Sequence, residues 1–248
     1  MLKCLRADLH IHTCLSPCAD LTMSPLRIVQ AALARRLDVI AICDHNSAEN
    51  VQAAMNAARG TDLSVCPAME ITSAEEVHVI GLFADAGAVL NMQKKVYDNL
   101  SSGKNDERLF GEQIIVNEAD EIMGYSDRLL IGATSISIEE VIAGIHELGG
   151  LAIASHIDRE AYSILGQLGF IPENLPLDAL EVSSRIESNQ AKHLFSQISA
   201  HPVITSSDAH NLDEIGKGVT IFQVERPTID EMRHALRNEN GRRVLLEK

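Results

Sequence analysis

The feature that most constrains the fold of this 248-residue chain is a repeated order of short apolar runs and helical patterns, in which most apolar runs end on a histidine or a carboxylate. The order recurs about seven times along the chain. Alternating strands and helices predict an α/β fold. Polar residues at the ends of most strands favour a (β/α) barrel, because a barrel builds its active site from the carboxyl ends of its strands. An open dinucleotide-binding sheet is disfavoured, since no G-x-G-x-x-G follows the first apolar run.

The first apolar run, Asp8-Leu9-His10-Ile11-His12-Thr13, delivers two histidines as it ends. Residues two apart in a strand point to the same face, so both imidazoles leave from one side and form half of a metal site. Ser24-Pro25 predicts a helix start, with the hydroxyl as the cap. Ser137-Ile138-Glu139-Glu140 is a capping-box pattern, and Thr228-Ile229-Asp230-Glu231 predicts the start of the last helix.

Histidines and carboxylates collected from the strand ends make up the candidate metal ligands. They are His10, His12, Asp20, His45, Glu70, His78, His156, Asp208 and His210. Imidazole and carboxylate ligands suit Zn, Mn or Fe(II) without separating them. Because this set exceeds what one or two ions need, we expect two or three divalent ions with a carboxylate as bridge. Adjacent ions activate water and stabilise an in-line phosphoryl displacement, so the set favours hydrolysis of a phosphoester.

The five cysteines are an odd number, and the chain enters a strand pattern directly rather than a signal peptide, which disfavours a disulfide framework. Cys14 and Cys18 stand near the histidine pair and could be thiolate ligands. A zinc knuckle is nevertheless disfavoured, because three residues separate them and no second cysteine pair follows. No apolar run approaches the ~20 residues that span a bilayer, so we expect a soluble, cytoplasmic protein.

Charge and arginine placement bear on the substrate. The net charge of −14 argues against a protein that grips duplex nucleic acid through its phosphates. It does not argue against a small phosphorylated metabolite or nucleotide, which is the substrate we expect. Arg159 and Arg185 follow strand ends and are candidates to bind substrate phosphate, with surface ion pairing as the alternative for each. The periodicity breaks down from about 84 to 135, which predicts a partly helical, lid-like insertion over the barrel mouth.

With these residues in place, the sequence resembles the PHP family, named from its polymerase-associated and histidinol phosphatase members. Residues 8–13 resemble its first motif, Cys43-Asp44-His45-Asn46 its second, Glu70 with His78 its third, and Ser207-Asp208-Ala209-His210 its last. His156 resembles the lone histidine between the third and the last. In this chain the loop from Cys14 to Ala19 is longer than the family's usual loop, and Leu21 follows Asp20 where a glycine is usual.

The resemblance implies a single distorted (β/α)7 barrel over residues 1–248 with a trinuclear metal centre. By position, one ion would be held by His10, His12, Glu70 and Asp208, a second by Glu70, His78 and His156, and a third by Asp20, His45 and His210. Glu70 would be the bridge, and Glu70 and Asp208 are the predicted catalytic residues. An amidohydrolase-like C–N hydrolase is the alternative enzyme. A non-catalytic, metal-binding regulatory module is the alternative of another class.

Overall fold

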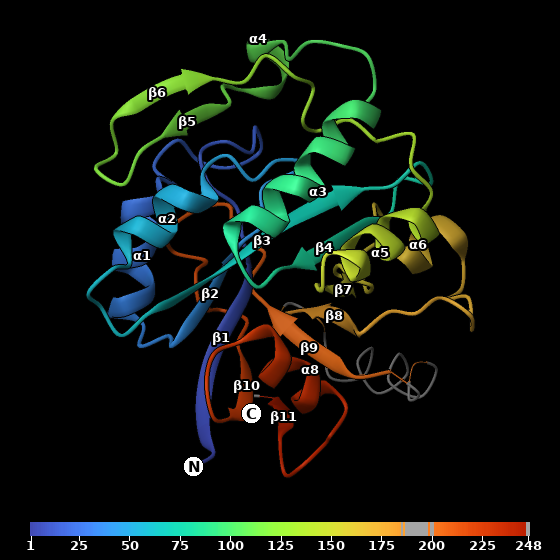
Figure 1. Cartoon of the computed structure of the whole chain (residues 1–248). Helices are drawn as coiled ribbons and strands as arrows, with labels where there is room; N and C mark the ends of the chain where they lie inside the picture. Colours follow the sequence, from blue (N-terminus) through green and yellow to red (C-terminus); the bar gives the residue numbers. More distant parts are fainter. Residues whose placement is uncertain (185, 187–197, 199–200, 247–248) are drawn as a thin grey trace.

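The computed structural model describes residues 1–184, 186, 198 and 201–246 of the chain (Figure 1). Arg185, one of the two arginines predicted to bind substrate, lies outside the described residues.

A nine-stranded sheet curls through the centre of the molecule, and helices pack around it (Figure 1). The strand order is β11-β10-β1-β2-β3-β4-β7-β8-β9. The strands are β1 (Lys3–Ile11), β2 (Val39–Ile42), β3 (Ser64–Thr72), β4 (His78–Leu82), β7 (Leu151–Ala154), β8 (Ala179–Ser183), β9 (Val203–Ser206), β10 (Thr220–Val224) and β11 (Arg243–Leu246).

The strands from β1 to β9 in this order form a nearly closed barrel of seven strands. Just beyond the end of β9, Ala209 pairs with Ile11 of β1 and closes the ring. There the His12 N–H donates to the Ala209 carbonyl at 3.0 Å, and the Ala209 N–H donates to the His10 carbonyl at 3.2 Å. The amino-terminal half of β1 pairs with β10 instead. The predicted distorted barrel is therefore confirmed.

The distortion has a local cause at β4, which runs antiparallel to both of its neighbours, β3 and β7. Only residues 73–77 separate β3 from β4, whereas a parallel crossover needs roughly a dozen residues. The reversal places His78, the first residue of β4, opposite Thr72 at the end of β3. His78 therefore lies at the same end of the barrel as the carboxyl ends of the parallel strands.

The helices are α1 (Pro25–Ala34), α2 (Val51–Ala57), α3 (Ala86–Asn99), α4 (Glu107–Phe110), α5 (Ile138–Glu147), α6 (Ile164–Leu168) and α8 (Ile229–Leu236). Ser137 and Glu140 form the predicted capping box of α5, each side chain accepting a hydrogen bond from the other residue's N–H. The Thr228 hydroxyl accepts from the Glu231 N–H at the start of α8, as predicted. Ser24 occupies the N-cap of α1, but its side chain makes no capping hydrogen bond, so the predicted cap is only partly realised.

Apolar side chains cover both faces of the sheet, which explains why the strands read as continuous apolar runs. In β2, Ile40 and Ile42 belong to the core cluster that includes the surrounding helices. Val39 and Ala41 belong to a second cluster, which gathers residues from the strands of the barrel and from α8. Among the described residues, no helix combines the length and the apolar character that a membrane span needs.

The stretch from 84 to 135 contains α3, α4, β5 (Ile114–Val116) and β6 (Ile122–Tyr125). β5 and β6 pair antiparallel in a small sheet separate from the barrel, and with α4 they lie at the top of Figure 1. The side chain of Asn50 attaches this small sheet to the barrel. Its Nδ2 donates to the Ile114 carbonyl at 3.0 Å, and its Oδ1 accepts from the Val116 N–H at 3.0 Å.

Candidate metal centre

Eight of the predicted ligands converge at one end of the barrel. His10 and His12 lie at the end of β1, His45 follows β2, Glu70 lies in β3, His78 begins β4, His156 follows β7, and Asp208 and His210 follow β9. All of them are buried except His210, which is partly exposed. The ends of six strands thus bring these side chains together from positions up to 200 residues apart in the chain.

Glu70 is the centre of this arrangement. Its Oε1 lies 3.0 Å from His78 Nδ1, 3.3 Å from His156 Nε2 and 3.4 Å from His10 Nε2. Its Oε2 lies 3.1 Å from His45 Nδ1 and 3.5 Å from His12 Nε2. One carboxylate therefore faces five imidazoles, three through Oε1 and two through Oε2.

Within the described residues, three groups of ligand atoms each fall within 4.8 Å of one another. The groups are His10, His12 and Asp208; His45, Glu70 and His78; and His12, His45 and His210. The resemblance implies His156 beside Glu70 and His78, and His156 Nε2 does approach Glu70 Oε1 at 3.3 Å. The ligand atoms are thus close enough for ions to bind between them.

Several of these atoms have the environment of metal ligands. Glu70 Oε1, His45 Nδ1, His78 Nδ1 and His156 Nδ1 are buried and make no hydrogen bond of normal geometry within the described residues, although His78 Nδ1 lies 3.0 Å from Glu70 Oε1 and His45 Nδ1 lies 3.1 Å from Glu70 Oε2. Buried polar atoms in proteins are nearly always hydrogen-bonded, so four orphans in one cluster require an explanation. Two imidazole nitrogens, His10 Nε2 and His12 Nε2, also face each other at 3.1 Å. Divalent cations would satisfy these atoms except His156 Nδ1, which points away from Glu70 because Nε2 of that ring faces it, and the donor set suits such ions.

Neighbouring side chains fix the ring orientation of the first two histidines. Both oxygens of Glu181 lie 3.1 Å from His10 Nδ1, which donates to them and leaves Nε2 toward the centre. Ser16 Oγ lies 3.0 Å from His12 Nδ1, and it donates to Asp44 Oδ1 at 2.7 Å. Such partners set the tautomer and the basicity of a ligating imidazole. The sequence analysis missed Glu181, whose only signal is a carboxylate inside an otherwise apolar strand.

Backbone strain also accumulates at the centre. His156, Asp208 and Asn46 are non-glycine residues with positive φ, of 27°, 49° and 50°. Such conformations cost about 1–3 kcal/mol each and persist where the surroundings impose them. For Asn46 the surroundings are visible, because its Oδ1 accepts from the Thr72 N–H at 3.0 Å and its Nδ2 donates to the Leu130 and Gly132 carbonyls at 2.8 Å.

The electrostatics favour the ionised forms of the carboxylates. Burial raises the pKa of Glu70, but the adjacent His78 and His10 imidazoles hold it well below its usual range. Burial likewise raises the pKa of Asp208, and its contacts with His10 and His12 bring it well below the ordinary value. Burial and the nearby His210 and His45 hold the pKa of His12 well below normal. Ionised carboxylates and neutral imidazole are the forms that bind metals.

A cavity of about 260 Å³ opens onto the cluster and carries the predicted substrate residue Arg159. Arg159 Nη1 lies 2.6 Å from Asp208 Oδ2, and its side chain is 36% exposed. Tyr162 stacks on His78, with ring centroids 4.7 Å apart and an interplanar angle of 16°. Ile131, from the predicted insertion, is also part of the wall. The cavity thus combines the cluster with a cation and an aromatic ring.

The structure does not bring the ninth predicted ligand, Asp20, into the cluster. The Asp20 N–H donates to the His210 carbonyl at 2.8 Å, so its backbone is close to the site. Its side chain, however, turns to solvent, where Oδ1 accepts from the Thr22 N–H at 2.8 Å. The assignment of Asp20 is corrected for this reason. Cys18, two residues earlier, lines the cavity instead.

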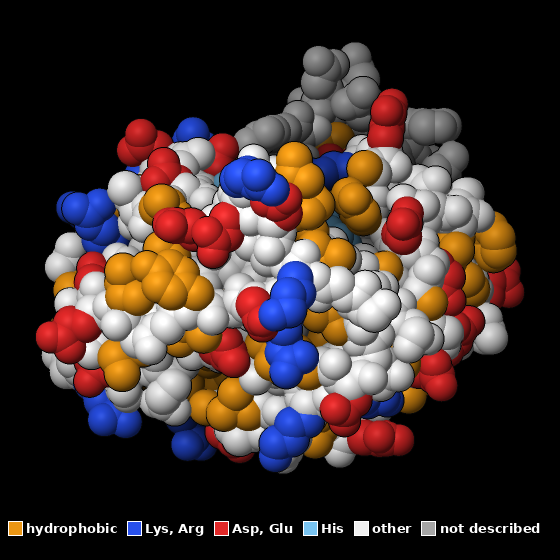
Figure 2. Space-filling model, turned by 90° about the horizontal axis from the view of Figure 1, so that it is seen from above, with side chains coloured by type: hydrophobic (Ala, Val, Ile, Leu, Met, Phe, Trp, Pro, Cys, Tyr) orange, Lys and Arg blue, Asp and Glu red, His pale blue; other side chains and the backbone are white. Residues whose placement is uncertain are grey.

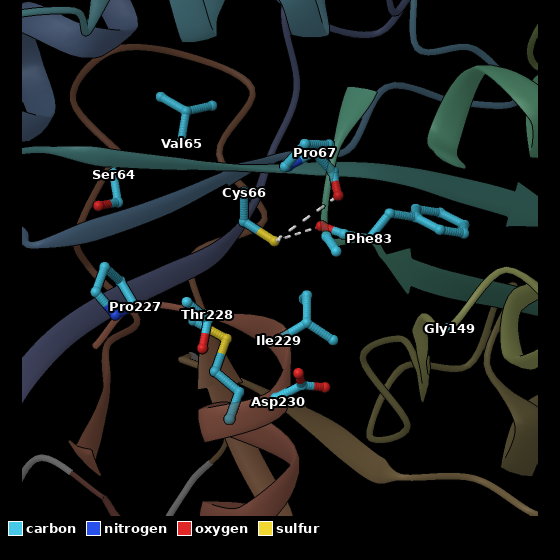
Figure 3. A pocket seen from close by; sticks show the side chains of 12 residues that line it. Ser64, Val65, Cys66, Pro67, Phe83, Gly149, Pro227, Thr228, Ile229 and Asp230 are labelled. Atoms are coloured by element: carbon cyan, nitrogen blue, oxygen red, sulfur yellow. Dashed lines mark hydrogen bonds between the residues drawn. The ribbon is translucent and has the colours of Figure 1, made fainter. Parts of the chain in front are cut away.

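A second cavity, of about 320 Å³, lies beside the amino-terminal end of β3 and the start of α8 (Figure 3). Its lining includes Cys66, whose thiol donates to the Pro67 and Phe83 carbonyls at 3.7 Å. Burial raises the pKa of this thiol to about 12, so it stays protonated. None of the clustered ligands lines this cavity. It therefore does not compete with the histidine cluster as the active site.

Comparisons with known proteins agree with this arrangement. The family model described as "PHP domain" matches residues 8–159, and the model described as "PHP-associated" matches residues 187–240. The uncharacterized protein YqxK of Bacillus subtilis is 28% identical over 106 residues, which cover 41% of this chain and 27% of that protein. A 5'-3' exoribonuclease of Haemophilus influenzae is 32% identical over 81 residues, 32% of this chain and 28% of that protein. This chain thus matches little more than a quarter of the length of either relative.

Two solved structures of endonuclease Q share the fold. The lesion-specific enzyme of Pyrococcus furiosus superposes with a TM-score of 0.71 at 19% identity, covering 98% of this chain and 58% of that chain. A complex of endonuclease Q with a 27-mer duplex that has an abasic lesion at the active site superposes with a TM-score of 0.67 at 18% identity, covering 97% and 58%.

The duplex complex overturns one prediction from composition. The expectation that the chain acts on a small substrate and does not grip duplex nucleic acid drew on the net charge of −14. It is wrong, because this fold binds duplex DNA in endonuclease Q. On the face of this chain shown in Figure 2, acidic and basic side chains are interspersed. The net charge of the chain therefore does not predict what binds to a surface on which both signs are interspersed.

Proposed function

The chain belongs to the PHP family, and we propose that it is a metal-dependent phosphoesterase that hydrolyses a phosphodiester bond of nucleic acid. The observation that carries the proposal is the approach of five imidazoles to the two oxygens of Glu70 within 3.5 Å. No apolar core needs such a cluster, and a cluster of orphaned ligand atoms is costly without cations to bind.

The proposed ligand sets follow the groups that the barrel assembles. One ion would be held by His10, His12, Glu70 and Asp208. A second would be held by Glu70, His78 and His156, with Glu70 shared as the bridge. His45 and His210 would hold a third. Zn, Mn and Fe(II) all accept these ligands.

Divalent ions at this centre would supply the polarisation of a phosphoryl oxygen and the activation of water that phosphoester hydrolysis needs. Glu70 and Asp208 are the proposed catalytic residues, because their ionised carboxylates hold the centre together and set its charge. Arg159 is the proposed phosphate ligand, since its guanidinium lies at the cavity wall and, among the described residues, pairs through Nη1 with Asp208 alone. A planar guanidinium can bind a phosphate through two parallel hydrogen bonds.

The substrate class is supported by relatives and by one residue. The curated relative with the higher identity is named an exoribonuclease, and two of the solved structures that share the fold are endonuclease Q. In this chain Tyr162 is 41% exposed beside the cavity. Aromatic rings at such positions stack on nucleobases, typically for about 1–3 kcal/mol per base. Tyr162 is therefore the proposed contact for a base next to the scissile phosphate.

We further propose that residues 1–248 form one barrel domain, and that the stretch from 84 to 135 acts as a lid-like specificity element. Its contribution to the cavity wall is Ile131. Asn46, next to the ligand His45, binds the carbonyls on both sides of Ile131. A substrate that displaces this stretch would therefore act on the centre through Asn46.

The test is hydrolysis by the purified chain after chelation and after addition of Mn²⁺, Fe²⁺ or Zn²⁺. The substrates are bis-p-nitrophenyl phosphate, p-nitrophenyl phosphate, and end-labelled single-stranded RNA, single-stranded DNA and abasic duplex DNA. We expect metal-restored cleavage of the diester and of at least one oligonucleotide. Asp208→Asn should abolish it, whereas Asp213→Asn, a control at a 98% exposed carboxylate, should not.

Metal-restored hydrolysis confined to the monoester would overturn the nucleic-acid assignment and leave a phosphatase. Absence of phosphoester turnover in a chain that binds metal would overturn the phosphoesterase assignment. A C–N hydrolase or a regulatory module would then be the better interpretation.

A further inference from the structure

The pair His45 and His210 lacks the carboxylate that the sequence led us to expect. The Asp20 side chain is held in solvent by its own turn, through the hydrogen bond from Thr22. Two histidines alone are an incomplete ligand set for a divalent ion, which takes four or more donors. The question is which other side chain of this chain reaches them.

Cys18 is in the loop that carries Asp20, and it lines the cavity together with both histidines. The Cys18 thiol makes side-chain hydrogen bonds with His210 and with His45. The thiol is therefore within hydrogen-bond reach of both rings.

A second observation points to an ion at this position. The ligand atoms of His12, His45 and His210 lie within 4.8 Å of one another, although three imidazoles have no reason to gather in an apolar interior. His45 is only 5% exposed, and its Nδ1 lies 3.1 Å from Glu70 Oε2. The cavity beside Cys18 thus contains two of the three imidazoles whose ligand atoms meet.

We propose that Cys18 Sγ, rather than the Asp20 carboxylate, is the protein ligand that joins His45 and His210 around the third ion. The inference rests on the metal-binding part of the proposed function, but not on its substrate. When the ion binds, the thiol releases its proton to solvent and a sulfur–metal bond forms, with no change of oxidation state. Thiolate with imidazole selects Zn²⁺ over Mn²⁺, so this position differs in metal preference from the carboxylate-rich positions around Glu70.

The neighbouring cysteine of the same loop does not have these properties. The Cys14 thiol is buried and donates to the Ile114 carbonyl at 3.7 Å. Cys14 does not line the cavity that Cys18 shares with His45 and His210. Cys4 is exposed at the start of β1, at the far end of that strand from His10. Cys4 is therefore a suitable control thiol.

The test is a Co²⁺ titration of the metal-free protein, with bound metal counted by elemental analysis. A thiolate bound to Co²⁺ gives an intense charge-transfer absorption in the near ultraviolet, which imidazole and carboxylate ligands do not give. We expect this band in the unmodified chain. Cys18→Ser should lose the band and one equivalent of bound Co²⁺, whereas Cys4→Ser and Asp20→Asn should keep both.

Co²⁺ binding without the band, a band that survives in Cys18→Ser, or loss of one equivalent in Asp20→Asn but not in Cys18→Ser would each overturn the proposal. X-ray absorption of the Zn²⁺-loaded, unmodified chain tests it without any substitution, since one sulfur neighbour at about 2.3 Å is expected. Neither readout involves turnover. Failure to hydrolyse any phosphoester would therefore count against the proposed function and leave the Cys18 result standing.

Discussion

Glu181 offers a sharp test of how the barrel tunes its metal centre, because it touches the centre only through other residues. Its carboxylate is fully buried, accepts from His10 Nδ1 at 3.1 Å, and also accepts from the His156 N–H at 3.1 Å. Glu181→Gln keeps the shape and removes the charge. The single amide oxygen must then serve both donors, while the new NH2 group favours the His10 tautomer that has its proton on Nε2, where a metal should bind.

We expect the metal affinity of Glu181→Gln to fall about 10- to 100-fold, as for other partners of ligating histidines. That loss corresponds to about 1.4–2.8 kcal/mol of binding free energy. The assay is competition with a chromophoric chelator for Zn²⁺ and Mn²⁺, alongside far-ultraviolet circular dichroism to verify folding. Glu139→Gln, at an exposed position of α5, is the matched control. An unchanged affinity in folded Glu181→Gln would refute the argument that this carboxylate sets the tautomer of His10.

Three further predictions follow from the site and from the fold. Arg159→Ala should raise KM for the diester about tenfold or more while changing kcat less, and an unchanged KM would remove Arg159 from the substrate site. Burial lowers the pKa of His10, but the charges of Glu181, Asp208 and Glu70 together outweigh burial and raise this pKa well above 6.5, so the folded, metal-free protein binds this proton more tightly than the unfolded chain does. Its Tm with chelator present should therefore fall as the pH rises above 6.5 through the raised pKa, and a Tm that rises over that range would contradict this sign. Ser137→Ala should cost about 1 kcal/mol of stability in urea unfolding by removing the capping box, with activity unchanged, and a stability equal to that of the unmodified chain would show that the cap contributes nothing.

The sequence was sufficient to predict the barrel and the family, both of which are confirmed. The reason is that strand ends in a barrel are forced together, so a histidine at each end implies a cluster without knowledge of any distance. Features that do not follow this rule were harder to predict. The direction of β4 follows from a connection too short for a crossover, and His78 reaches the centre as the first residue of a strand rather than the last.

The side-chain directions in the loop after β1 could not be predicted from the sequence. Cys18 and Asp20 are two residues apart in an irregular loop, and no periodicity decides which side chain turns inward. The choice is made by tertiary contacts, namely the hydrogen bond of Asp20 with Thr22 and the contacts of the Cys18 thiol with the two imidazoles. Glu181 was missed for a related reason, since its partner His10 lies 171 residues away in the chain.

The failed exclusion of nucleic acid has a physical cause of its own. A net charge counts every carboxylate equally, but Glu70, Asp208 and Glu181 are buried at the centre and face imidazoles. Each bound divalent ion would add two positive charges where a substrate phosphate must come closest. The local field would then oppose the sign of the whole molecule. A phosphodiester responds to the field at the cavity that holds Arg159, so the affinity for nucleic acid should depend on metal loading far more than on the exposed acidic residues.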